Sequence, residues 1–355
     1  MPNPGLARRA RGGSLKAMTE ASSQIAAQQR APLRRAYALL GSAIDRVEQR
    51  LSETYRSTVS LIPEVSGHLI ASGGKRIRPV MLMLSAQAAG ARPAAGLDLA
   101  VAAELLHNAT LLHDDVVDRG ELRRGVASAP QVFGNSASVL VGDFLLSRAL
   151  GLVVAHGDAA LLQRFSAMLA DMAEGEILQL LRSGQLDVSL PEYVAIISGK
   201  TAGLFSWCCR AGASLAGEDA AAIEGAGRFG QAFGMAFQVT DDILDYTAAP
   251  EQSGKDLAND LLQGKATLPL LLACIEDADL KRLVQQTARS EPPPEESCRR
   301  IVRRVLASPS LTSALAEARG YADEAGDALA DFAGGEARRV LQALVDFVIE
   351  RVRLP

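Results

Sequence analysis

The sequence is poor in cysteine, in aromatic residues and in net charge. Only 4 cysteines occur among 355 residues and none form a Cys-x-x-Cys pair, which excludes a disulfide scaffold and a zinc site of ordinary spacing. A reducing, cytoplasmic location fits this usage best. The formal net charge is −4, whereas nucleic-acid-binding domains are usually basic, so we expect no nucleic-acid partner. Aromatic residues make up 4% of the chain, so its core must consist mainly of aliphatic side chains.

Strand patterns and long apolar runs are also missing. No segment alternates polar and apolar residues between hairpin turns, and no run of 18 or more residues is uninterruptedly apolar, which disfavours sheets and a membrane span. From Pro32 onwards almost every segment has helical spacing, broken by short Gly or Pro clusters. The longest such segments are 97–118, 136–155, 159–182, 192–216, 219–246 and 335–352. We therefore predict one large all-α domain.

The N-terminal residues differ from this pattern. Residues 1–18 contain four basic side chains and no acid, which is typical of a transit peptide, although a secretory apolar core is missing. A disordered tail, or a true start at Met18, are the alternatives. We assign residues 1–32 to a basic, disordered tail and residues 33–355 to the all-α domain. Any membrane contact would be peripheral.

Two helical segments, 97–112 and 136–154, are apolar almost all the way round. A helix without a polar face lies in the centre of a bundle or spans a membrane, and we predict the centre of a bundle for both. Asp143, in the second segment, is then expected to be a buried, hydrogen-bonded acid. Trp207 and the neighbouring Cys208 and Cys209 are expected in the core.

Two identical acidic clusters follow apolar helices. The first is Asp114-Asp115-x-x-Asp118 and the second is Asp241-Asp242-x-x-Asp245. In each cluster the first and last aspartates are four residues apart and share one helix face, where their repulsion requires a positive partner. Facing carboxylates form an oxygen-only site that suits Mg²⁺. A di-iron site is disfavoured because Glu-x-x-His occurs only once.

Basic residues accompany these acids. They are Lys75, Arg76, Arg78, Arg123, Arg124, Lys200, Lys255 and Lys265. Gly199-Lys200-Thr201 lacks the upstream glycines of a phosphate-binding loop. Acids and bases around an apolar bundle together indicate Mg²⁺-bridged diphosphates with an apolar tail between helices.

These motifs resemble those of the trans-isoprenyl diphosphate synthases, in particular the long-chain polyprenyl diphosphate synthases of quinone biosynthesis. The resemblance runs from about residue 40 to the C-terminus. It rests on His107 and on segments 73–79 (GGKRIRP), 111–118 (LLHDDVVD), 123–125 (RRG), 141–145 (VGDFL), 175–176 (GE), 199–201 (GKT), 238–245 (QVTDDILD) and 264–269 (GKATLP). Residues 126–128 (VAS) depart from the Lys-Pro-Thr that is common in the family.

The resemblance implies a homodimeric helical bundle around a central cavity. It implies several Mg²⁺ ions, replaceable by Mn²⁺, held under an allylic diphosphate by Asp114, Asp118 and Asp241, with Asp115, Asp242 and Asp245 in support. Arg123, Lys200, Thr201, Gln238, Lys255 and Lys265 would hold the phosphates or assist. Isopentenyl diphosphate would be bound by Lys75, Arg78, His107 and Arg124.

The expected chemistry agrees with these residue types. Cations stabilise the departing diphosphate, an allylic cation forms, isopentenyl diphosphate attacks it, and a proton is lost to the released diphosphate, as the resemblance implies. No nucleophilic Ser, Cys or His is required. Three alternative functions remain: a terpene cyclase, a non-catalytic subunit of a heteromeric prenyltransferase, and a metal-dependent phosphohydrolase.

Product length is predicted from the helix that precedes Asp114. Short-chain relatives carry a bulky aromatic residue four or five positions before the first aspartate, where this chain has Thr110 and Ala109. With Leu106 and Ala102 these residues would line an open channel of roughly 18 Å. The resemblance then implies about eight to ten isoprene units. A shorter product, of about three or four units, is the alternative.

Other polar residues receive weaker predictions. His68 and His156 are interpreted as surface or packing residues. Glu174, Glu176 and Gln179 share one helix face, which either lines the site or is solvated. Arg351 and Arg353 are placed to cover the site in a closed state.

Overall fold

The structure is a computed structural model that describes residues 31–71, 73–182, 188–247, 259–290 and 294–354. Almost all of these residues are helical, which confirms the all-α prediction. The α-helices are α2 (Ala31–Leu40), α3 (Ser42–Thr54), α4 (Leu61–Ala71), α5 (Ile77–Ala88), α6 (Leu97–Val117), α7 (Ala129–Phe133), α8 (Asn135–His156), α9 (Ala159–Arg182), α10 (Leu190–Ile197), α11 (Gly203–Ser214), α12 (Ala220–Thr247), α14 (Asn259–Leu262), α15 (Leu268–Glu276), α16 (Ala278–Ala288), α17 (Glu295–Leu306), α18 (Ser310–Ala328) and α19 (Glu336–Glu350). Shorter helical turns are η1 (Pro93–Gly96), η2 (Ser198–Ala202) and η3 (Leu329–Asp331).

Two predictions concern residues outside this description. The predicted tail spans residues 1–32, of which 1–30 lie outside the described residues, and α2 already begins at Ala31. Lys255 also lies outside them. The prediction of a single domain from residue 33 stays a prediction.

Two buried hydrophobic clusters share the long helix α12, which contributes Phe229 and Phe233 to one and Met235 and Val239 to the other.

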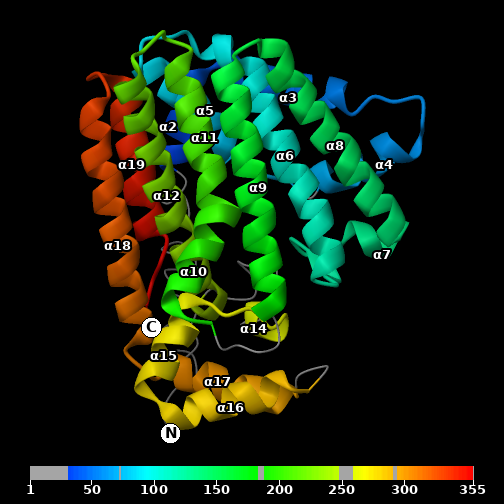
Figure 1. Cartoon of the computed structure of the whole chain (residues 1–355), viewed down its shortest axis with the longest axis vertical. Coiled ribbons are helices and arrows are strands. Elements are labelled where there is room, and N and C mark those ends of the chain that lie inside the picture. Colours follow the sequence, from blue (N-terminus) through cyan, green and yellow to red (C-terminus); the bar gives the residue numbers. More distant parts are fainter. Residues whose placement is uncertain (1–30, 72, 183–187, 248–258, 291–293, 355) are drawn as a thin grey trace, which may run out of the picture.

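The bundle is organised around α6. Figure 1 shows α6, α9, α11, α12 and α18 running along the long axis of the molecule, with α16 and α17 lying across one end. Every side chain of α6 from Leu99 to Leu106 is at most 3% exposed, and the helix packs against α8, α5 and α3. This confirms the prediction that the apolar segment 97–112 occupies the centre. The acidic end of α6 is thereby fixed against the surrounding helices.

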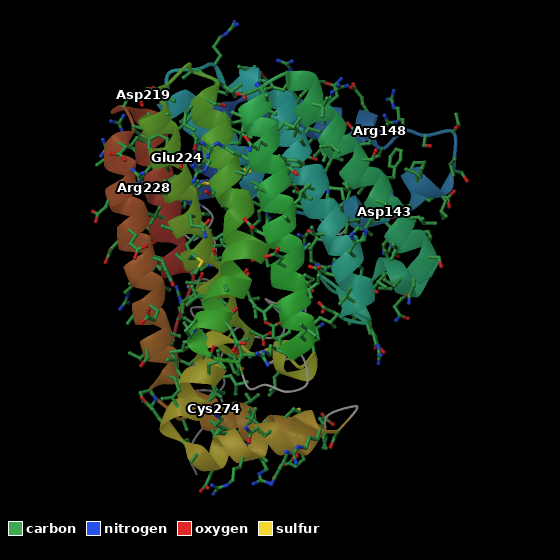
Figure 2. The ribbon with its side chains drawn as sticks, viewed as in Figure 1. Asp143, Arg148, Asp219, Glu224, Arg228 and Cys274 are labelled. Atoms are coloured by element: carbon green, nitrogen blue, oxygen red, sulfur yellow. The ribbon has the colours of Figure 1, made fainter. Side chains whose placement is uncertain are left out.

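The prediction of a central position for segment 136–154 is wrong. Helix α8 packs on α6 with one side only and lies at the edge of the bundle (Figure 1). Its outer side carries Val139, Leu140, Leu150 and Val154, which are 37–66% exposed. Asp143 is 60% exposed rather than buried, and Figure 2 shows it on this peripheral helix. An apolar pattern all around a helix does not tell which side the same chain covers.

Helix α8 also meets a simple criterion for a membrane span. It is the one helix of the described residues that is long and apolar enough to cross a bilayer by length and composition. Of its most apolar 18-residue window, 39% is buried within the fold. A single helix of this kind is weak evidence, because helices of protein interiors have the same composition.

The segment after the first acidic cluster forms a hairpin that the sequence did not reveal. Strands β1 (Leu122–Arg123) and β2 (Val126–Ala127) pair antiparallel. Arg124 and Gly125 form the tip with φ of 52° and 81°, the positive values that a two-residue hairpin turn requires. Val126, the first of the residues that depart from the family's Lys-Pro-Thr, pairs with Arg123 in this hairpin. The hairpin places Arg124 at the cavity described below.

Helix α12 approaches α11 and the preceding turn η2 closely at two glycines. A Cβ atom at Gly230 would lie 2.4 Å from the carbonyl oxygen of Phe205, and one at Gly234 would lie 2.5 Å from the Cα of Ala202. Any side chain there would force the helices apart. This contact brings η2, which carries Lys200 and Thr201, against the second acidic helix.

Candidate active site

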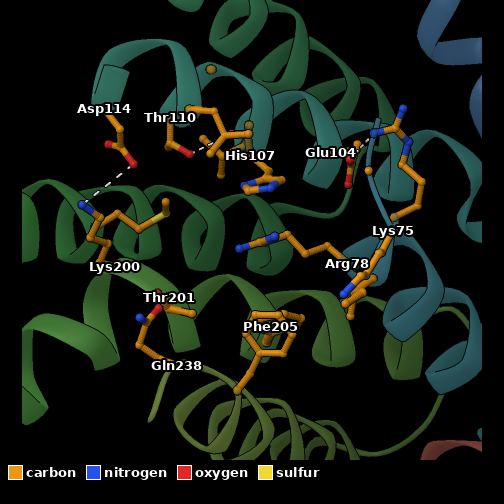
Figure 3. A pocket seen from close by; sticks show the side chains of 18 of the residues that line it. Lys75, Arg78, Glu104, His107, Thr110, Asp114, Lys200, Thr201, Phe205 and Gln238 are labelled. Carbon is orange, nitrogen blue, oxygen red and sulfur yellow. Dashed lines mark hydrogen bonds and ion pairs between the residues drawn. The ribbon is translucent and has the colours of Figure 1, made fainter. Parts of the chain in front are cut away.

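Most of the predicted site residues line one cavity of about 1130 Å³ between α5, α6, α9, η2, α11 and α12. Figure 3 shows Asp114 and Lys200 facing each other in one part of the cavity, with Lys75 and Arg78 in another. Aliphatic side chains from α6, α8 and α9 form the remaining wall. The cavity therefore combines an acidic region, a cationic region and an apolar wall.

The acidic end of α6 is paired with lysines. Asp114 lies 3.8 Å from the Nζ of Lys200, and burial raises the pKa of Asp114 to about 6 against the lowering effect of that lysine. The Nζ of Lys265 donates to Asp118 at 2.6 Å. Burial is the largest single effect and lowers the pKa of Lys265, but the charges of Asp118, Asp260 and Asp114 together with the hydrogen bond to Asp118 outweigh it, so the pKa lies above its usual value. As predicted, Asp114 and Asp118 are one helical turn apart and both have a cationic partner.

Asp115 and Arg123 bind each other instead of facing the cavity. The Nε of Arg123 donates to both carboxylate oxygens of Asp115 at 2.8 Å, and Nη2 donates to one of them at 2.5 Å. Asp115 is 3% exposed, and neither residue lines the cavity. This geometry does not support the predicted contacts of Arg123 with phosphate. The pair connects α6 to the hairpin and so fixes the position of Arg124.

The two adjacent acids of the second cluster have different environments. Asp241 lines the cavity, and its Oδ1 forms an ion pair with Nη1 of Arg351 at 2.7 Å. Asp242 is 3% exposed and accepts hydrogen bonds from Tyr193, Gln238 and the backbone of Leu268 at 2.7–3.1 Å. Burial raises the pKa of Asp242 to about 7. Asp242 therefore joins α12 to α10 and α15, whereas Asp241 faces the cavity.

The last aspartate of that cluster has a similar supporting position. Asp245 accepts the backbone N–H of Asp260 at 3.2 Å and so connects α12 to α14. Its predicted role in support of the metal ligands stays a prediction.

Lys200 and Thr201 lie on η2, a π-helical turn between α10 and α11. Such turns often mark functional sites, because one extra residue changes the direction of the side chains. Lys200 also forms an ion pair with Glu176 on α9. The Oγ1 of Thr201 donates to Gln238 Oε1 at 2.8 Å, and Gln238 Nε2 donates to Asp242. Glu176, which the sequence left undecided, thus lines the site.

The cationic region is built from α5, α6 and the hairpin. Lys75, Arg78, Arg124 and His107 all line the cavity, as predicted together. The guanidinium of Arg78 lies 4.9 Å from the ring centroid of Phe205, and its buried Nε has no hydrogen-bond partner in the described part of the chain. Burial lowers the pKa of Arg78 and of Arg124. An anion entering here would meet the Nε of Arg78, which is unpaired among the described residues.

His107 is uncharged in this surrounding. Burial and then the charge of Arg78 lower its pKa well below the usual value. A neutral imidazole offers one donor and one acceptor, which suits hydrogen bonding to a substrate.

Three of the four residues predicted for the chain-length wall line the cavity. They are Leu106, Ala109 and Thr110, opposite aliphatic side chains of α8 and α9. Thr110 Oγ1 donates to the carbonyl of His107 at 2.8 Å. Ala102 is fully buried and does not line the cavity. As predicted, Trp207 and its neighbouring cysteines are buried, and His156 is exposed. Arg353, which we predicted to cover the site together with Arg351, is exposed and does not line the cavity.

The sequence analysis assigned no individual role to three further residues at this cavity. Glu104 is a buried carboxylate in the middle of α6, Arg76 binds it, and Tyr37 of α2 donates to the carbonyl of Lys75 at 2.7 Å. A lone glutamate in an otherwise apolar helix was the available signal for Glu104, because such a charge must be paired.

A family model of known proteins matches this chain. The model for polyprenyl synthetase covers residues 59–305, more than half of the sequence. The chain belongs to the polyprenyl synthetase family. It is a prenyltransferase, which confirms the predicted resemblance to the long-chain trans-isoprenyl diphosphate synthases.

Individual relatives agree with this assignment. The octaprenyl diphosphate synthase of Escherichia coli is 42% identical over 227 residues, 64% of this chain and 70% of the relative. An all-trans-nonaprenyl-diphosphate synthase of Rhodobacter capsulatus is 44% identical over 228 residues, 64% of this chain and 70% of the relative. The crystal structure of a polyprenyl synthase from Caulobacter crescentus, complexed with calcium and isoprenyl diphosphate, superimposes with a TM-score of 0.85 at 40% identity. It covers 91% of this chain and 98% of that one.

Proposed function

We propose that this synthase condenses isopentenyl diphosphate repeatedly with an allylic diphosphate, such as farnesyl diphosphate, in the presence of Mg²⁺. The product would be an all-trans polyprenyl diphosphate of about eight to ten isoprene units for a quinone side chain. The observation that carries this proposal is the common cavity in which an acidic region, a cationic region and an aliphatic wall meet.

The acidic residues fit a magnesium site. Asp114, Asp118 and Asp241 offer oxygen ligands only, the kind that Mg²⁺ prefers. Among the described residues no three His, Cys, Asp or Glu side chains form a ready metal site. Mg²⁺ is usually held by one or two carboxylates together with substrate phosphates, so such a site is not required. When bound, Mg²⁺ would neutralise the diphosphate and make it a better leaving group, and Mn²⁺ is expected to replace it.

The residues of the acidic region would support the departing diphosphate. Lys200 would place its charge at the phosphate oxygens while the carbon–oxygen bond breaks and its electron pair leaves with the diphosphate. Thr201 and Gln238 would orient the phosphates through their shared hydrogen bond. Lys265 is connected to this region through its ion pair with Asp118. Lys255, the further lysine of this set, remains part of the proposal from the resemblance.

The cationic region would hold isopentenyl diphosphate. Lys75, Arg78 and Arg124 would bind its diphosphate, and neutral His107 would donate a hydrogen bond. Its double bond supplies the electron pair of the new carbon–carbon bond to the allylic cation. A proton then leaves and restores a double bond, with the released diphosphate as the acceptor that the resemblance implies. The apolar wall keeps water away from the cation.

We also propose a homodimer. The outer side of α8 exposes Val139, Leu140, Leu150 and Val154, a row of large apolar side chains that a second copy would cover. The resemblance to a dimeric family and this exposed row support the same arrangement. A cytoplasmic location, with at most peripheral membrane contact during product release, completes the proposal.

The test is an elongation assay with the purified full-length protein, Mg²⁺, farnesyl diphosphate and labelled isopentenyl diphosphate. Products are dephosphorylated and separated by length. Asp114→Asn is expected to lose about a hundredfold or more in rate. The matched control, Asp323→Asn, removes an exposed acid of α18 and is expected to retain the wild-type rate.

Each result decides between the alternatives. Long products support the proposal, and products that stop at about three or four isoprene units contradict the long-chain part of it. A folded protein without any condensation identifies a non-catalytic subunit. Release of phosphate without elongation identifies a phosphohydrolase. Both of these last results overturn the proposal.

A further inference from the structure

Arg76 is a cavity residue whose guanidinium is held by protein carboxylates. Its Nε donates to Glu48 Oε1 at 2.6 Å and its Nη2 to Glu48 Oε2 at 3.2 Å, while Nη1 donates to Glu104 Oε1 at 2.9 Å. The Arg76 side chain is 8% exposed and that of Glu104 is 4% exposed. Each nitrogen of the guanidinium thus has a carboxylate partner. Unlike Arg78, whose Nε has no partner among the described residues, Arg76 has little left to offer a substrate.

The backbone at Arg76 is in the left-handed region. Its φ and ψ are 43° and 37°, a conformation that costs a non-glycine residue about 1–2 kcal/mol. Such a residue persists only where its surroundings fix it. Here Glu48 of α3 and Glu104 of α6 hold the side chain, and Tyr37 of α2 holds the preceding carbonyl. This reversal lies directly before α5 and separates Lys75 from Arg78.

Arg76 also neutralises the buried charge of Glu104. Burial raises the pKa of Glu104, and the charges of Arg76 and then Arg78 lower it, so both arginines act on the same carboxylate. Without Arg76, the unpaired Glu104 would be left to attract Arg78, because a buried carboxylate must find a cation. Arg78 would then be drawn away from any diphosphate.

We propose that Arg76 is a positioning residue for isopentenyl diphosphate. Clamped between Glu48 and Glu104, it fixes the turn that carries Lys75 and Arg78 and keeps Glu104 from pairing with Arg78. It does not itself bind the substrate. This inference rests on the proposed function, because it assumes that the cationic region binds isopentenyl diphosphate.

The test compares Arg76→Gln, Arg76→Lys and the double variant Arg76→Gln/Glu104→Gln. Arg76→Gln is expected to raise the KM for isopentenyl diphosphate at least about tenfold, since truncating one partner of a buried charge pair is costly. The KM for farnesyl diphosphate is expected to change much less. Arg76→Lys is not expected to restore binding, because an ammonium cannot replace a guanidinium that bridges two carboxylates.

The double variant gives the sharper result. It removes the unpaired carboxylate together with the arginine, so it is expected to recover much of the lost affinity. The matched control is Arg210→Gln, which breaks another partly buried ion pair, with Glu224, away from this cavity. That control is expected to lower thermal stability and leave both KM values unchanged.

A purely structural role predicts a different pattern. If Arg76→Gln raises both KM values in proportion, leaves the isopentenyl KM unchanged, or is not improved by Glu104→Gln, the inference is wrong. Calorimetric titration with isopentenyl diphosphate alone, in EDTA, keeps this test separate from catalysis. Wild-type protein that binds isopentenyl diphosphate in this titration but does not elongate farnesyl diphosphate in the separate assay with Mg²⁺ would refute the proposed function. Equal binding by Arg76→Gln would refute the positioning role.

Discussion

Arg351 Nη1 lies 2.7 Å from Asp241 Oδ1, so the residue that follows the C-terminal helix is paired with the first acid of the second cluster. The same guanidinium donates to the carbonyl of Phe237 at 2.7 Å and covers the ring of that residue at 4.3 Å. The predicted placement of Arg351 over the site thus has a definite contact. Arg351 and a metal ion would compete for the same carboxylate.

Removing this competitor is expected to strengthen metal binding by the substrate-free protein. Because Asp241 is 43% exposed, its ion pair is worth about 1 kcal/mol at most, so Arg351→Gln is expected to tighten Mn²⁺ binding about fivefold. Electron paramagnetic resonance of free Mn²⁺ measures this without turnover. Arg353→Gln, the same charge change at an exposed neighbour, is the control. If both variants bind Mn²⁺ more tightly to the same extent, the change in net charge explains the effect and the competition between Arg351 and the metal is refuted.

Asp242 is expected to make stability depend on pH. Burial raises its pKa from 3.8 to about 7, so the protonated acid stabilises the fold below about pH 4 and this contribution is lost as pH rises through 7. About three pKa units at about 1.4 kcal/mol each give an upper value of about 4 kcal/mol. Relative to Asp242→Asn, the wild-type free energy of unfolding in metal-free urea titrations is expected to fall over this range. Parallel pH profiles would contradict the assignment.

A bulky residue in the α6 wall is expected to shorten the product. Ala109 and Thr110 line the cavity, so Ala109→Phe would fill the channel that a growing chain needs. Because Ala109 is 1% exposed, Phe there also strains the core, and Thr110→Phe provides a second, less buried variant. Product lengths are compared with those of Ala316→Phe, an exposed site on α18. An unchanged spectrum in both wall variants would show that the wall lies elsewhere.

His107 is expected to be neutral at neutral pH, since burial and the charge of Arg78 lower its pKa well below the usual value. Nuclear magnetic resonance of labelled imidazoles measures this directly, and His107→Gln assigns the signal by its disappearance. A His107 signal that titrates near about pH 6.5 would contradict the buried, cation-lined environment.

The exposed side of α8 is expected to be the contact between two copies. Leu140 is 66% exposed, so Leu140→Glu is expected to leave the monomer folded and to weaken the dimer, measured by light scattering after size exclusion. Ile275→Glu, at a residue of α15 that is 67% exposed, serves as the control. A wild-type monomer, or a dimer unaffected by Leu140→Glu, would refute this interface.

The sequence predicted the central helix and both acidic clusters because these depend on local patterns. Periodicity placed α6, and the four-residue spacing placed Asp114 and Asp118 on one turn. Contacts between distant segments could not be predicted in the same way. Arg76 meets Glu104 across 28 residues of chain, and nothing in either segment specifies that partner.

Charge alone also could not separate binding residues from structural ones. Arg123 and Arg124 are adjacent, yet one is bound to Asp115 while the other lines the cavity. Their difference arises from the positive φ at the hairpin tip, a backbone property that the two letters do not encode. The exposed side of α8 was likewise hidden, because an apolar residue looks the same whether its neighbour is the same chain or another.

The distribution of aromatic rings in the cavity has a consequence for product length. Phe205 and Phe237 lie on the α11 and α12 side, next to the arginines, whereas the apolar part of the α6, α8 and α9 wall consists of leucine, isoleucine, alanine and methionine, with one threonine. Flexible aliphatic side chains can change rotamer as a tail presses on them, and flat rings cannot bend. The end stop that we propose for the growing tail would therefore be compliant, and a series of neighbouring chain lengths is expected instead of one sharp cutoff.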